Sequence, residues 1–215
     1  MKRCVFSVFL FALALCCHAE LVQVCADSLR NCDLLFVVNN RGNAITAVTE
    51  GTDSLPIDHV AIFYADAQNG APMVVQADYD GVRRSGLRAF CTENGDSSAV
   101  LVGRLTAALD CEKSLANAFS FLGKPYDYDY LPDDEAIYCS ELVQKSYVAP
   151  EGNLVFSTIP MTFRDRDGAI PEFWLQHYAA KGIAVPEGAP GTNPGEMSRR
   201  KEVKIVGWLQ MPSDN

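Results

Sequence analysis

Short apolar runs bounded by turn residues recur along most of the chain and predict β-strands. The longer runs have five to seven residues and are rich in Val, Ile, Leu and Phe, which suits buried strands. A shorter strand followed by a turn is expected within residues 82–90. The longer strands are predicted at residues 33–38, 58–64, 73–77, 99–105 and 203–209.

Apolar residues three or four positions apart predict helices among these strands. Gly123 is placed to end the helix before it, and Pro171 suits the first turn of the last helix. Loops are expected at residues 124–134 and 182–199. The helices are predicted at residues 21–31, 110–122, 139–147 and 171–181. Strands interrupted by a few helices indicate an α+β fold with a small antiparallel sheet.

The first residues follow the order of a secretory signal peptide. Lys2 and Arg3 precede an apolar run over residues 5–15, and a small residue follows at Ala19. We therefore expect residues 1–19 to be removed after Ala19. A retained N-terminal anchor and a lipoprotein site at Cys16 are the alternatives. No later segment is apolar enough to span a bilayer, and residues 20–215 are expected to form a single domain.

Composition and charge narrow the class of partner. Hydrophobic residues make up 48% of the 215-residue chain and charged residues 21%, as in an ordinary globular protein. Loss of the leader changes the formal charge from −9 to −11, because two cations and no carboxylate are removed. Such an acidic surface repels phosphate backbones, so nucleic acid is not an expected partner. The oligomeric state is left open.

Cysteine and histidine are the residue types that limit the chemistry most. An odd number of cysteines outside the leader leaves at least one thiol free or paired with another molecule. The sequence has no C-x-x-C motif and no Cys/His spacing typical of a zinc site, so no metal is expected. Any Cys–His chemistry must use His59 or His177. The cysteines outside the leader are Cys25, Cys32, Cys91, Cys111 and Cys139.

Three residues form a candidate catalytic group. Cys139 begins a predicted helix, whose unpaired N–H groups and positive end are expected to lower the thiol pKa. His59 opens an apolar strand, and Gln76 lies inside another, where it could orient an imidazole through a hydrogen bond. The alternatives are a buried structural cysteine, a structural histidine and a solvent-facing glutamine. His177 falls on the polar side of an amphipathic helix.

A loop that alternates tyrosine and aspartate precedes Cys139. It contains Tyr126 and Tyr128, and Tyr138 lies next to Cys139. Together with Asp58, which precedes His59, these residues are the candidate substrate-binding residues, because loops near a nucleophile shape its pocket. The alternative is a surface loop held in place by tyrosine packing.

The order of these segments resembles the YiiX/YaeF-type families, a circularly permuted branch of the NlpC-like papain-fold superfamily. The resemblance covers roughly residues 30 to 150, and its histidine strand precedes its cysteine helix. It departs at Cys32, where the family usually has Gly, and at Gln76, where it often has Glu. The segments that carry it are Asp33-Leu34-Leu35-Phe36, Asp58-His59-Val60-Ala61-Ile62, Val75-Gln76-Ala77 with Gly81-Val82, Gly123-Lys124-Pro125-Tyr126-Asp127 and Tyr138-Cys139-Ser140-Glu141-Leu142-Val143.

The resemblance implies a small barrel-like antiparallel sheet with the cysteine helix packed against it. It further implies that Cys139 is the nucleophile, His59 the base and Gln76 the orienting residue of a cysteine hydrolase. Together with the predicted leader, this makes an exported hydrolase, periplasmic or bound to the cell envelope, the expectation. The expected reaction cleaves an amide bond in a peptide, cell-wall or lipid-like N-acyl substrate through an acyl-enzyme, without a cofactor. An acyltransferase or thioesterase on lipid-like substrates, and a catalytically silent envelope binding module, are the alternatives.

Overall fold

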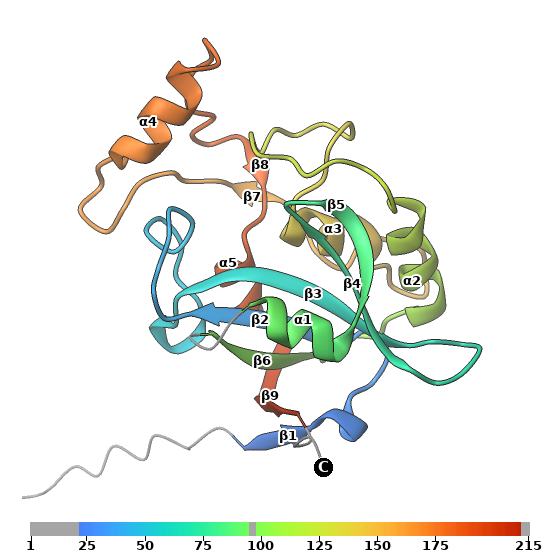
Figure 1. The fold of residues 1–215 in the computed structure, drawn as a ribbon. Helices are drawn as coiled ribbons and strands as arrows, with labels where there is room; N and C mark the ends of the chain where they lie inside the picture. Colours follow the sequence, from blue (N-terminus) through green and yellow to red (C-terminus); the bar gives the residue numbers. More distant parts are fainter. Residues whose placement is uncertain (1–21, 95–97, 212–215) are drawn as a thin grey trace, which may run out of the picture.

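The computed structural model describes residues 22–94 and 98–211, so the predicted leader lies outside the described residues. A seven-stranded sheet runs through the molecule in the order β1-β9-β6-β2-β3-β4-β5 (Figure 1). Neighbouring strands are antiparallel except for the parallel pair β1 and β9. The strands are β1 (Gln23–Cys25), β2 (Leu34–Asn39), β3 (Ile57–Ala65), β4 (Pro72–Asp78), β5 (Gly81–Gly86), β6 (Ser98–Leu105) and β9 (Val203–Gln210).

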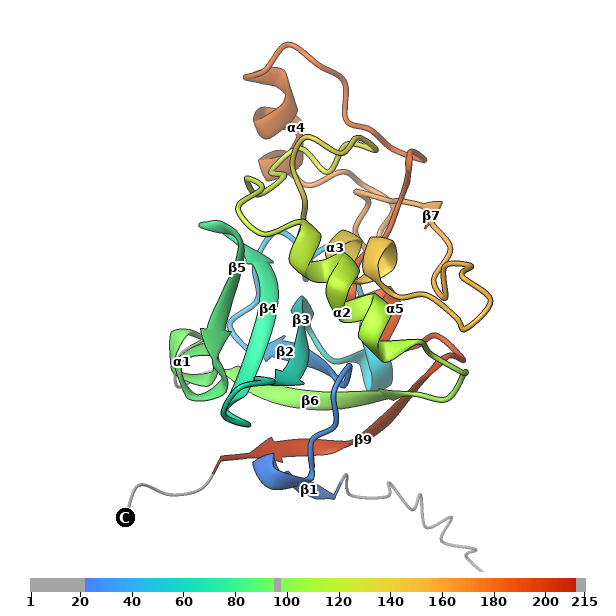
Figure 2. The ribbon, with the colours of Figure 1, turned by 90° about the vertical axis from the view of Figure 1, so that its right-hand side faces the viewer.

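Helices cover both faces of this twisted sheet. The helices α2 and α3 pack on one face and α1 on the other, while β4 and β5 run across the direction of β6 and β9 (Figure 2). None of the described helices is long and apolar enough to span a membrane. The helices are α1 (Leu87–Glu93), α2 (Cys111–Ser120), α3 (Cys139–Ser146), α4 (Glu172–Ala179) and α5 (Pro194–Ser198), with short 3₁₀ helices at Ala26–Ser28 and Thr52–Ser54.

The central strand β2 explains why its sequence is apolar at successive positions. Leu34, Phe36 and Val38 pack in the cluster that includes α3, whereas Leu35 and Val37 pack in the cluster that includes α1. Successive side chains of a strand point to opposite faces, so a strand covered on both faces has no polar side. This double burial places β2 and its neighbour β3 at the centre of the fold.

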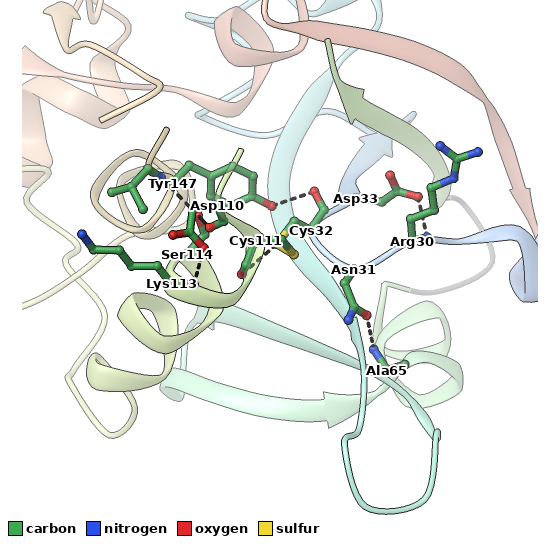
Figure 3. The surroundings of a disulfide bond; sticks show 11 residues. Arg30, Asn31, Cys32, Asp33, Ala65, Asp110, Cys111, Lys113, Ser114 and Tyr147 are labelled. Atoms are coloured by element: carbon green, nitrogen blue, oxygen red, sulfur yellow. Dashed lines mark hydrogen bonds between the residues drawn. A yellow bond between two sulfur atoms is a disulfide. The ribbon is translucent and has the colours of Figure 1, made fainter. Parts of the chain in front are cut away.

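A disulfide fastens the α2–α3 layer to the sheet. Cys32, just before β2, is bonded to Cys111, the first residue of α2 (Figure 3). The Tyr147 hydroxyl, after the end of α3, donates a hydrogen bond to the Cys32 carbonyl oxygen at 3.0 Å. On the other side of Cys32, buried Asp33 accepts two bonds from Arg104 at 2.6 and 2.8 Å. The described thiols at Cys25, Cys91 and Cys139 are free.

A C-terminal excursion leaves the sheet layer and carries α4. It passes through the small ribbon of β7 (Ile159–Pro160) and β8 (Pro190–Gly191), and α4 projects beyond it (Figure 1). The excursion has its own apolar cluster, which includes Met161, Phe163 and Trp174. The Trp174 indole N–H donates to the Ala44 carbonyl oxygen at 3.2 Å, so the excursion is tied to the loop between β2 and β3.

The structure confirms the predicted strands and the helices α2, α3 and α4, with shifted ends. The helix predicted at residues 21–31 is wrong, because Gln23–Cys25 pairs with β9 and only a 3₁₀ turn follows. The sheet is therefore not wholly antiparallel. Residues 82–90 contain β5 but then enter α1 instead of a turn, and the loop predicted at 182–199 contains β8 and α5. Pairing and packing between distant segments outweigh local periodicity at these places.

Candidate active site

Cys139 occupies the first position of α3. Tyr138 caps this helix in extended conformation, and its N–H points to the Glu141 side chain with an N–O distance of 3.4 Å. Its carbonyl oxygen accepts the first helical bond from Leu142. The predicted placement of Cys139 at a helix start is therefore confirmed, and its side chain is only 2% exposed.

Burial dominates the electrostatics of the Cys139 thiol. Removal from water raises the pKa of Cys139 to about 12. The backbone N–H groups of Val60, Ser140 and Cys139 itself lower this pKa, but by less. The expectation that the helix start would give a lowered pKa is therefore wrong. The N–H groups do act in that direction, but the cost of burying a thiolate is larger. The thiol is neutral at physiological pH.

His59 is oriented by a buried amide. Its Nε2 lies 2.7 Å from Oε1 of Gln76, on the neighbouring strand β4. Because an amide oxygen only accepts hydrogen bonds, this contact places the imidazole proton on Nε2 and leaves the Nδ1 lone pair available. Gln76 is 2% exposed, so the alternative that it faces solvent is wrong.

The His59 imidazole also favours its neutral form. Burial lowers the pKa of His59 below its usual 6.5, while the bond to Gln76 and the charge of Asp58 raise it. Partly buried at the pocket, the His59 imidazolium would lose some of the water that solvates its charge, and a neutral glutamine replaces only part of that solvation. His59 is therefore available as a base at and below neutral pH.

Packing of α3 against β3 brings the cysteine and histidine segments together. The Val60 N–H that acts on the Cys139 thiol belongs to the residue next to His59. Cys139 lines an apolar pocket, whereas His59 and Gln76 line a polar pocket. Tyr126 and Ile45 line both pockets, so the two adjoin each other at these residues. A thiol and an orientable base thus line neighbouring pockets, which suits acyl transfer chemistry.

The profile of the family described as permuted papain-like amidase enzyme, YaeF/YiiX, C92 family, matches residues 29–207. The chain belongs to this family. A crystal structure of yiiX from Escherichia coli O157:H7, described as a metalloprotein, shares the fold with a TM-score of 0.67. That likeness covers 85% of this chain and 98% of the yiiX chain at 20% identity. No curated protein matched this chain.

The predicted relationship to the YiiX/YaeF family and its permuted papain fold is therefore confirmed. The family is one of amidases, so the chain is an amide-cleaving enzyme of the papain-like type. Within residues 22–94 and 98–211, no three or more His, Cys, Asp or Glu side chains are grouped to hold a metal ion.

The four predicted substrate-binding residues occupy different parts of this candidate site. Tyr138 lines the apolar pocket and Tyr126 lines both pockets. Tyr128 is 46% exposed and stacks on Tyr79 farther out, with ring centroids 6.1 Å apart. Asp58 lines the polar pocket, where its carboxylate accepts bonds at 2.8 Å from Asn39 and 2.6 Å from Asn43.

The second histidine serves the excursion. His177 lies on α4 with Nε2 at 2.9 Å from the Tyr128 carbonyl oxygen and 3.1 Å from Asp129. Its predicted place on a helix is confirmed, and its contacts fasten α4 to the tyrosine loop.

Sequence reasoning missed two supports of the cysteine helix in this amidase. Buried Glu141 lies 3.0 Å from Lys145, and burial raises the pKa of Glu141 to about 7. A Glu three residues after a helix cap is a signal that could have identified it. Thr192, from the excursion, donates its hydroxyl to Ser140 at 3.0 Å and its N–H to the Tyr138 hydroxyl at 3.0 Å. No local pattern links residues so far apart in the chain.

Proposed function

We propose that the protein is an exported cysteine amidase in which Cys139 is the nucleophile, His59 the base and Gln76 the orienting residue. The observation that carries the proposal is the 2.7 Å contact between His59 Nε2 and Gln76 Oε1. It frees Nδ1 as a proton acceptor on the strand against which the Cys139 thiol packs. Membership of an amidase family supports the choice of an amide substrate.

The proposed reaction begins with a neutral thiol and a neutral imidazole. His59 removes the thiol proton as the sulfur attacks the amide carbonyl carbon, and the carbonyl π electrons move to oxygen. The N–H groups near the thiol, those of Val60, Ser140 and Cys139, are placed to stabilise the oxyanion. The oxyanion then collapses, the C–N bond breaks, and the nitrogen takes the proton from His59 to leave as an amine.

The remaining thioester on Cys139 is resolved by water. His59 accepts a proton from the water as its oxygen attacks the thioester carbonyl, and the C–S bond breaks. The thiolate regains the proton from His59, and the acyl group leaves as a carboxylic acid. These steps balance without a cofactor, and the substrate class is an amide of a peptide, cell-wall or lipid-like molecule.

The direct test measures amide hydrolysis and the acyl-enzyme together. Cys139→Ala should abolish turnover and remove any acyl adduct detected by mass spectrometry of the intact protein. His59→Ala should lower kcat/KM by about 10²- to 10⁴-fold, the usual contribution of a positioned base. The matched controls are Cys91→Ala and His177→Ala, which should change kcat/KM little. Undiminished hydrolysis by Cys139→Ala would overturn the proposal.

The fate of the acyl-enzyme distinguishes an amidase from the alternative functions. A trapped thioester that decays only to the carboxylic acid supports an amidase. Preferential transfer to an added amine or alcohol would instead identify an acyltransferase. A Cys139 that forms no thioester with any amide or activated ester would favour a catalytically silent binding module.

Export rests on two further observations. The first 19 residues follow the signal-peptide pattern, and the Cys32–Cys111 disulfide suits an oxidising compartment such as the periplasm. The envelope is therefore the proposed location of the substrate.

A further inference from the structure

We propose that the apolar pocket beside Cys139 binds a short apolar acyl group, so that the substrates are amides of such acids. This inference rests on the proposed function, because it assigns the pocket to the acyl half of the amide. Among the proposed substrate classes, it favours amides with a short acyl group over lipid-like amides with a long acyl chain.

Buried apolar side chains form the inner wall of this pocket. Tyr138, Met161, Phe163 and Trp174 are each between 3% and 6% exposed and all line it. Ile45, Val48 and Thr162 line the pocket from less buried positions. A charged group placed here would lose its water without gaining an opposite charge, whereas an apolar group gains by burial.

The size of the pocket limits its occupant to a few carbon atoms. Its cavity volume is about 40 Å³. An apolar cavity that accepts a benzene ring is about 150 Å³. The space inside the pocket is therefore too small for a ring or a long alkyl chain. Because the pocket is open on one side, a short apolar group that lies partly at its mouth is the expected fit.

Hydrogen bonds hold the walls in place, so the pocket cannot easily widen. Trp174 is fixed through its indole N–H to Ala44, on the loop that also carries Ile45 and Val48. The Tyr138 hydroxyl accepts a hydrogen bond from the N–H of Thr192, just after β8, at the base of the excursion seen in Figure 1. Because these walls belong to different segments that are bonded together, a larger group has to break a contact to enter.

The position of the base assigns this pocket to the acyl group. The leaving amine takes its proton from His59, which lines the polar pocket. The carbonyl carbon must bond to the Cys139 sulfur, and Cys139 lines the apolar pocket. The two halves of the amide therefore point into different pockets, with the acyl half on the apolar side.

The test uses p-nitrophenyl esters of acetic, isobutyric, isovaleric, hexanoic and decanoic acids, because acylation of Cys139 by them does not depend on the amine. The acylation rate constant is measured by p-nitrophenol release, divided by that of N-acetylcysteine, and checked by the thioester mass. Isobutyryl and isovaleryl esters should react about 10-fold faster than the acetyl and decanoyl esters, as expected for a pocket that distinguishes single carbon atoms.

Two pocket variants should move this optimum in opposite directions. Val48→Phe fills the pocket and should slow isovaleryl acylation about 10-fold or more, with little effect on acetyl. Met161→Ala enlarges it and should move the optimum towards hexanoyl. The matched control is Ile183→Phe, an exposed apolar position on the same excursion, which should leave the profile unchanged.

The outcomes separate the two proposals. Equal rates for isovaleryl and decanoyl esters, or an equal loss of all rates in Val48→Phe, would overturn the pocket assignment while the Cys139 mechanism stands. Absence of any thioester on Cys139 would overturn the proposed function, and the pocket assignment would fail with it.

Discussion

The charge state of the two reacting residues is set by burial. Burial raises the pKa of Cys139 to about 12 and lowers the pKa of His59, so both residues are neutral before substrate binds. A neutral pair avoids the cost of a buried thiolate beside a partly buried imidazolium. It also requires the proton to move from sulfur to imidazole as the carbonyl is attacked.

This neutral pair predicts the acid side of the pH profile. His59 must be unprotonated to accept the thiol proton, and its lowered pKa keeps it unprotonated below its usual 6.5. We therefore expect kcat/KM for amide hydrolysis to fall, as pH decreases, with an apparent pKa below 6.5. The measurement is kcat/KM from roughly pH 4 to pH 8, a span that covers this limb. A limb at or above 6.5 would contradict it.

Gln76→Glu supplies the control for this assignment. A carboxylate beside Nε2 stabilises the imidazolium, so it should raise the His59 pKa and move the acid limb up by about 1 to 3 pH units. Gln68→Glu makes the same chemical change at an exposed position on the turn before β4 and should leave the limb in place. If both variants keep the wild-type limb, His59 is not the base that the profile reports.

The position of the site depends on how helices are held on the sheet. Leu142 and Val143 of α3 are buried against the face of the sheet that carries Val60 and Ile62. The Cys32–Cys111 disulfide joins the start of β2 to the start of the neighbouring helix α2. It thus closes a loop over 79 residues that contains the His59 and Gln76 strands.

We expect this disulfide to stabilise the fold substantially. Cys32→Ala combined with Cys111→Ala should lower the free energy of unfolding by about 2 to 4 kcal/mol, because the unfolded chain regains the entropy of an open loop. Urea unfolding measures the difference, and wild-type protein with reductant separates loss of the cross-link from loss of packing. Cys25→Ala, at an exposed thiol, is the control. Identical urea midpoints for the double variant and wild type would contradict the expectation.

Prediction from the sequence worked where a pattern is local. The apolar runs of β2, β3, β4, β6 and β9 identify strands because each signal lies within one continuous segment of the chain. The parallel pairing of Gln23–Cys25 with β9 could not be predicted, because it joins the two ends of the described chain. The walls of the apolar pocket could not be predicted for the same reason, because they come from segments far apart in the sequence.

The candidate site divides in the same way. Local order in the sequence is enough to place Cys139 at a helix start and Gln76 in a strand. The net pKa of the thiol could not be predicted, because it depends on burial by segments distant in the sequence. The catalytic roles of Cys139, His59 and Gln76 stay predictions.

For the molecule as a whole, the leader and the disulfide make one joint prediction. If residues 1–19 direct export, the chain produced with its leader should yield a protein that begins at Glu20 and contains the Cys32–Cys111 bond. The same chain started at Glu20 should remain in the reducing cytoplasm with both thiols free. Intact mass after alkylation distinguishes the two states, and N-terminal sequencing locates the cleavage.

A Cys111→Ser variant with its leader should still begin at Glu20, because cleavage precedes folding. An exported protein that keeps Lys2 and Arg3 would instead favour the retained anchor, whereas one that begins at Cys16 would identify a lipoprotein.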